Sequence, residues 1–112
     1  MKATIALPYP VFLLFLVCCS ASCSTTPEAI HHQLHTVEIT GMKFQPAVLT
    51  VNNGDTVVFV NKDLLTHNVT EENKGWSSTP LSANQSYKKV IKESSGYYCS
   101  FHPVMKGKLI VK

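Results

Sequence analysis

The sequence predicts an all-β protein folded as an antiparallel β-sandwich, and three observations lead to this fold class. Short runs of β-branched and aromatic residues recur along the chain. The segments between them are rich in Asn, Asp, Gly and Ser, which favour turns. Signals for helices are weak throughout. With 112 residues, the chain has room for one small domain and a leader.

Seven runs carry the strand signal, and the spacing between them is typical of a sandwich. They cover residues 36–40, 48–51, 56–60, 67–70, 87–92, 97–100 and 108–111. Turn sequences separate several of them, at 52–55, 61–63, 72–75 and 94–96. Apolar residues at alternate positions are expected to face the core, namely Leu49, Val51, Val57 and Phe59.

The N-terminus has the features of a signal peptide. Lys2 is followed by an apolar stretch over 5–17, which is too short to cross a membrane as a helix. Small residues at 20–22 precede Cys23, and this arrangement resembles a bacterial lipoprotein cleavage box. We therefore predict a signal peptide over 1–22, with Cys23 lipidated and the protein anchored to a membrane on the periplasmic side of the cell envelope. The first alternative is ordinary cleavage near residue 21 or 22, which releases a soluble protein, and the second is a retained membrane helix.

A polar segment over 23–35 separates the leader from the predicted domain at 36–112. It contains Pro27 and shows no sustained periodicity, so we predict a flexible tether. Its histidines, His31, His32 and His35, are interpreted as solvated linker residues. A loosely bound metal is the second interpretation.

The cysteines are distributed unevenly. Cys18, Cys19 and Cys23 lie in or at the end of the leader, which leaves Cys99 as the single cysteine of the domain. In an oxidising compartment an unpaired thiol tends to be oxidised. Cys99 is therefore either a buried apolar residue or a metal ligand.

The segment after Cys99 favours its interpretation as a metal ligand. His102 and Met105 follow at intervals of three residues, and His67, upstream, can supply a second imidazole. Two histidines, one cysteine and a weak axial methionine form the ligand set that selects copper for electron transfer. Zinc is the main rival ion, but it normally binds a tetrahedral Cys/His set without Met. Taken singly, a methionine most often fills a core and a histidine is most often structural, so the spacing carries the prediction.

These residues resemble the cupredoxins, the family of type I (blue) copper proteins, among the amicyanin- and plastocyanin-like members. The short C-x2-H-x2-M loop is most similar to that of the amicyanins. Further stretches resemble that group in the same order along the chain: 44–46, 54–61, 67–69 and 105–108. The resemblance covers nearly the whole domain and implies a Greek-key β-sandwich, the cupredoxin fold, with one copper that alternates between Cu(I) and Cu(II).

The resemblance also implies two residues that support the ligands. Asn68 is similar to the family asparagine that joins the two ligand loops, with Ser100 as its partner. The backbone N–H of Asn68 is then expected to point at the sulfur of Cys99, since a thiolate is stabilised by donors. The alternative is that both are exposed polar residues.

The predicted function is a one-electron carrier, not an enzyme. A copper oxidase or nitrite reductase needs further histidine pairs, and a Cys/His hydrolase needs a third orienting residue. The net charge of +3 comes from 10 lysines spread along the chain, so nucleic acid is not expected as a partner. We expect a monomer that meets protein electron donors and acceptors transiently. A copper-binding or copper-delivery protein of the envelope is the alternative.

Overall fold

The computed structural model describes residues 3–4, 6, 10 and 17–112. Most of the apolar stretch predicted as the signal peptide core therefore lies outside the described residues. Within the described part, no helix is long and apolar enough to cross a membrane. The described chain contains eight strands and no helix: β1 (Leu34–Thr40), β2 (Lys43–Gln45), β3 (Val48–Val51), β4 (Thr56–Asn61), β5 (Thr70–Glu71), β6 (Ser86–Val90), β7 (Ser95–Cys99) and β8 (His102–Val111).

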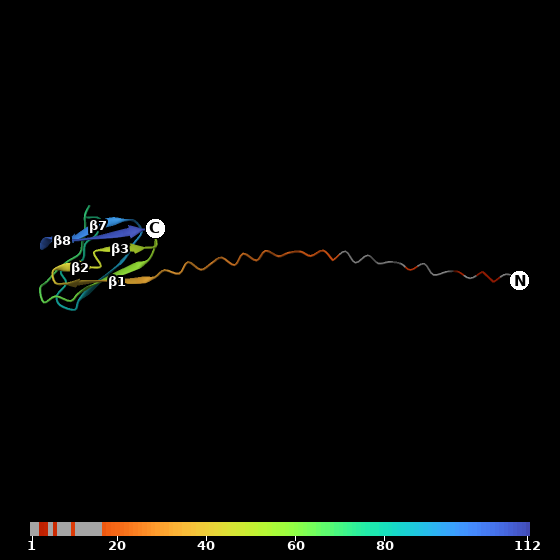
Figure 1. Ribbon diagram of the computed structural model, residues 1–112, viewed down its shortest axis with the longest axis horizontal. Coiled ribbons are helices and arrows are strands. Elements are labelled where there is room, and N and C mark those ends of the chain that lie inside the picture. Colours follow the sequence, from red (N-terminus) through yellow and green to blue (C-terminus); the bar gives the residue numbers. More distant parts are fainter. Residues whose placement is uncertain (1–2, 5, 7–9, 11–16) are drawn as a thin grey trace.

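The strands form two four-stranded sheets, which confirms the predicted all-β sandwich (Figure 1). One sheet has the order β2-β1-β4-β6 and the other the order β3-β8-β7-β5. The sheets are mixed rather than purely antiparallel, because β1 pairs with β4 and β3 pairs with β8 in parallel. The two strands of each parallel pair are connected through other strands of the chain. A sequence pattern of short strands and turns does not specify such long connections, so the parallel pairing was not predicted.

The core lies between the two sheets and follows the alternation of the strands. In β4 every second side chain is buried, among them Val57 and Phe59, and Val51 of β3 is buried opposite them. Leu49 is partly buried and packs against this core. The inward-facing positions predicted from the sequence are therefore confirmed. Tyr97 of β7 completes the centre, with its ring edge-on to those of Phe44 and Phe59.

Several strands differ in extent from the prediction. The short β2 was not expected, since three residues carry too little pattern. Of the run at 67–70, only Thr70 lies in a strand, which continues to Glu71, while His67 makes an isolated bridge with Leu81. The last strand begins at His102 and not at Lys108, so the predicted metal loop belongs partly to β8.

The segment 17–33 lies outside both sheets and leaves the sandwich at the end where β8 finishes (Figure 1). β1 begins at Leu34, two residues before the predicted domain boundary. The reason is that Asp55, fully buried, accepts hydrogen bonds from the amide of Gln33 and from the ring of His35. The ring of His32 also packs against Gly54, where any side chain would clash. The last residues of the predicted tether thus belong to the domain.

Candidate metal centre

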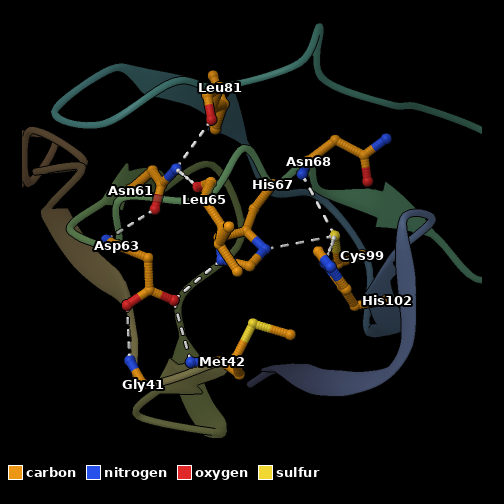
Figure 2. Close-up of polar contacts among 10 residues, drawn as sticks. All are labelled: Gly41, Met42, Asn61, Asp63, Leu65, His67, Asn68, Leu81, Cys99 and His102. Carbon is orange, nitrogen blue, oxygen red and sulfur yellow. Dashed lines mark hydrogen bonds and ion pairs between the residues drawn. The ribbon is translucent and has the colours of Figure 1, made fainter.

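Three side chains with metal-binding atoms meet at the opposite end of the sandwich. The Sγ atom of Cys99 lies 3.8 Å from Nδ1 of His67 and 3.8 Å from Nδ1 of His102. All three donor atoms lie within 4.8 Å of one another. Cys99 and His67 are completely buried, whereas His102 is partly exposed. The structure therefore brings together three of the four predicted ligands around one point (Figure 2).

A hairpin places Cys99 beside His102. β7 ends at Cys99, β8 begins at His102, and only Ser100 and Phe101 lie between them. In a connection of two residues, the residues on either side form a pair, and their side chains lie on the same face of the sheet. Cys99 and His102 are such a pair. The interval of three residues in the sequence thus becomes direct proximity in the fold.

Met105 lies in β8, three residues after His102, and its side chain is buried. The pairing of β8 with β7 jumps here, because His102 pairs with Cys99 while Lys106 pairs with Tyr98. Residues 103–105 therefore form a bulge. A bulge changes the direction in which a side chain points, and bulges are frequent beside functional sites. This bulge separates Val104, which is 89% exposed, from the buried Met105 next to it.

His67 comes from the loop between β4 and β5, and its backbone is fixed by Leu81. The two residues exchange backbone hydrogen bonds of 3.1 and 2.7 Å. The ring is held as well, since Nε2 lies 2.9 Å from Oδ2 of Asp63. The nitrogen that faces Cys99 is therefore Nδ1, and the nitrogen that faces away contacts a carboxylate (Figure 2).

Asn68 and Ser100 join the two loops that carry the donor atoms. The backbone N–H of Asn68 donates to Sγ of Cys99 at 3.4 Å. The amide of Ser100 donates to Oδ1 of Asn68 at 2.7 Å, and Nδ2 of Asn68 donates to Oγ of Ser100. Asn68 is only 7% exposed, so it is not a free surface residue. The structure thus contains the contacts that the family resemblance implied for these two residues.

Asn61 and Asp63 were interpreted from the sequence only as turn residues, but both contribute to this site. Asp63 contacts the ring of His67, and Asn61 accepts a hydrogen bond from the amide of Asp63. Oδ1 of Asp63 accepts a hydrogen bond from the amide of Gly41, and Oδ2 accepts one from the amide of Met42. Burial alone would raise the pKa of Asp63, but these two amides and the ring of His67 outweigh it and lower that pKa below its ordinary value. The one signal in the sequence was the position of Asp63, four residues before His67.

The tether histidines do not join this group. His35 contacts Asp55 at the start of β4, whereas His67 follows the end of β4. Among the described residues, the one group of His, Cys, Asp and Glu side chains close enough to hold a metal is that of His67, Cys99 and His102.

The three donor atoms fit a single metal ion. With metal–sulfur and metal–nitrogen bonds of about 2.3 and 2.0 Å, two ligands at an angle of roughly 120° lie about 3.7 Å apart. The two observed sulfur–nitrogen separations are both 3.8 Å, and no two of the donor atoms are more than 4.8 Å apart. Two imidazoles with one thiolate suit copper in a trigonal arrangement.

Comparisons with known proteins point to the same chemistry. A family model described as a cupredoxin-like domain matches residues 11–111. Amicyanin from Paracoccus denitrificans is 30% identical over an alignment of 83 residues, which covers 68% of this chain and 63% of the length of that protein. The chain thus spans less than two thirds of this curated relative.

Solved structures agree in fold. The structure of a methionine-to-alanine variant of amicyanin with Cu(I) is 29% identical, with a TM-score of 0.66 over 70% of this chain and 82% of that one. A copper-containing nitrite reductase from Thermus scotoductus SA-01 is 28% identical with a TM-score of 0.65, over 70% of this chain but only 22% of the enzyme.

Proposed function

Because the chain belongs to the family of cupredoxin-like domains, we propose that it is a one-electron carrier whose single copper is held by His67, Cys99, His102 and Met105. The observation that carries this proposal is the pair of Nδ1 atoms, each 3.8 Å from the sulfur of one buried cysteine. When bound, copper supplies one-electron chemistry by alternating between Cu(I) and Cu(II).

The residues around the donor atoms are arranged to keep them in place. His67 is fixed through its backbone and its ring, and the Asn68–Ser100 hydrogen bonds connect its loop to the Cys99–His102 hairpin. The amide of Asn68 stabilises negative charge on Sγ. Ligands that move little when the oxidation state changes favour fast electron transfer.

The surface around His102 is the proposed docking face. His102 is the partly exposed member of the donor group, and residues near it in the chain expose large apolar side chains. The proposed docking face consists of residues that flank His102 in the chain, with further exposed apolar residues near Asp63, which contacts His67: Phe101, Pro103 and Val104, with Met42, Leu64 and Leu65 as further candidates. Leu64 is 95% exposed and Val104 is 89% exposed. An apolar face of this kind supports a weak contact that dissociates quickly, as a carrier needs with a protein donor and a protein acceptor.

We further propose that Cys23 is lipidated and tethers the domain to a membrane on the periplasmic side. The chain enters β1 at the end of the sandwich where β8 finishes (Figure 1), whereas Cys99 ends β7 and His102 begins β8. The proposed docking face therefore points away from the tether. From Cys23 to Gln33 the chain can span at most about 35 Å. The mass of the native N-terminus tests this part: a diacylglyceryl cysteine at position 23 supports it, and an unmodified terminus contradicts it.

A copper-delivery protein remains the second candidate, because a domain of this kind could also bind Cu(I) for transfer. Voltammetry of the copper-loaded protein distinguishes the two. A carrier gives a stable, reversible one-electron couple and keeps its copper when an apo-acceptor is added. Loss of Cu(I) to the acceptor, without a reversible couple, would overturn the proposal.

A further inference from the structure

We propose that Asp63 is a positioning residue for His67: its carboxylate holds the ring so that Nδ1 faces the sulfur of Cys99, and it favours the higher charge of Cu(II). This inference rests on the proposed copper site. The contact joins Oδ2 of Asp63 to Nε2 of His67 at 2.9 Å, on the side of the ring opposite Cys99 (Figure 2).

The contact is not an ordinary surface ion pair. Surface pairs contribute little because water competes for both partners. Here the side chain of His67 is 0% exposed and that of Asp63 is 16% exposed. The ring cannot turn to a solvent-facing position, so its orientation is decided by the groups that contact its two nitrogens.

Asp63 is itself fixed from two sides. The amides of Gly41 and Met42 donate to its two carboxylate oxygens at 2.8 and 3.0 Å. Gly41 and Met42 have φ angles of +58° and +60°, so two successive residues adopt the left-handed conformation. These two residues form the turn between β1 and β2, and a turn can direct neighbouring N–H groups at one anion. Met42 adopts this conformation although it has a side chain, which normally disfavours it.

The other side of Asp63 is fixed by Asn61. Oδ1 of Asn61 accepts a hydrogen bond from the amide of Asp63 at 2.9 Å. Nδ2 of Asn61 donates to the carbonyls of Leu65 and Leu81, both at 2.8 Å. Leu81 is the residue that pairs with the backbone of His67. The ring and the backbone of His67 are thus held by one connected set of hydrogen bonds.

The chemistry follows from the two distinct nitrogens of imidazole. A neutral ring carries one hydrogen, and the hydrogen bond that one nitrogen makes decides which nitrogen can bind a metal. A carboxylate accepts and cannot donate when ionised, so it selects the form with hydrogen on Nε2. Nδ1 then presents its lone pair toward Sγ. The negative charge of Asp63 also makes Nδ1 of His67 a stronger electron-pair donor to the metal. A stronger ligand of this kind stabilises Cu(II) more than Cu(I).

The first test uses the copper-free protein and therefore does not depend on the proposed function. Nitrogen-15 NMR in mildly alkaline buffer should find His67 as the Nε2–H form, with its proton hydrogen-bonded and slow to exchange. Asp63→Ala should give a mixture of the two forms. The Nδ1–H form in the wild-type protein, or an unchanged ring in a folded Asp63→Ala variant, would overturn the inference. Because the wild-type spectrum is itself decisive, a variant that fails to fold does not remove the test.

The second test uses the copper-loaded protein. Asp63→Asn removes the charge and keeps the size of the side chain, so it should move the reduction potential to a more positive value and weaken Cu(II) binding by about 10- to 100-fold. Asp63→Glu keeps the charge, so its reduction potential and its affinity for Cu(II) should both be close to those of the wild type. Glu93→Gln, which removes an equal charge from an exposed position, is the control and should change neither. A potential that moves equally in Asp63→Asn and Glu93→Gln would reduce the effect to overall charge and contradict positioning. If the wild type binds no copper while His67 is the Nε2–H form, the proposed function fails and the placement of the ring stands.

Discussion

Nδ1 of His67 lies 3.8 Å from Sγ of Cys99, although 32 positions separate the two residues in the chain. Two separate connections hold them together. The loop with His67 pairs with Leu81, and the loop with Cys99 is joined to Asn68 through Ser100. The donor atoms are therefore placed by the protein itself, and each connection can be broken separately.

Removing the Asn68 side chain should destabilise the copper-free protein. Asn68→Ala removes the acceptor of the Ser100 amide, and the loss of such a part-buried hydrogen bond costs about 0.5–1.5 kcal/mol of unfolding free energy. Urea denaturation of the copper-free protein measures it. Asn73→Ala, at an exposed turn position, is the control and should stay near the wild type. Equal stability of the two variants would mean that the two loops are held together by other contacts.

Replacing Met105 should change the reduction potential and not the fold. Met105→Leu conserves volume in a buried position, so its cost in stability is expected to be below about 1.5 kcal/mol. Loss of a weak axial sulfur ligand disfavours Cu(II) and should raise the reduction potential while the visible colour persists. Voltammetry and absorption spectroscopy measure the two effects. An unchanged potential would place Met105 among the core residues only.

Acid should remove the stabilisation that Asp55 provides. Hydrogen bonds from the amide of Gln33, the ring of His35 and the amide of Asn52 outweigh burial and lower the pKa of Asp55 from 3.8 to about 2. A carboxyl group whose pKa is lower in the folded state stabilises the fold above its unfolded pKa. That contribution is lost as the pH falls from 3.8 to about 2.

Unfolding free energy measured against pH tests this assignment. Asp55→Asn should be less stable than the wild type at neutral pH and should lose less stability across the acidic window. Parallel curves for the two proteins would show that Asp55 is not the group responsible.

A charge on the proposed docking face should slow electron transfer without changing the copper site. Val104 is 89% exposed at the tip of the bulge, so Val104→Glu should leave the absorption spectrum intact and slow transfer to a protein partner by about tenfold. Val90→Glu places the same charge on an exposed valine at the far end of β6 and is the matched control. Stopped-flow kinetics compares them, and equal rates for both variants would move the docking site elsewhere.

The sequence predicted the sandwich and its inward-facing residues because alternation along β4 is directly visible in residues such as Val57 and Phe59. It also pointed to the Cys99–His102 pair, since an interval of three residues across a short turn is a local pattern. The parallel pairing of β1 with β4 was not predicted. It depends on long connections that leave no periodic signal.

The surroundings of His67 were also only partly predictable. Asn61 and Asp63 belong to residue types that are common in turns, so their presence between two strands needs no further explanation. Their part in the site depends on Gly41, Met42 and Leu81, which are distant in the sequence. In the same way, the packing of His32 and His35 on residues 54–55 could not be read from a polar segment without periodicity.

Titration of the purified copper-free domain with Cu(II), followed by visible absorption, tests the central claim most directly. A thiolate bound to Cu(II) gives an intense sulfur-to-copper charge-transfer band, and Cys99 is the single cysteine of the domain. We predict a strong visible band that saturates at one copper per chain and is absent in Cys99→Ala. A colourless wild-type complex, or a band that persists in Cys99→Ala, would contradict the assignment of this site.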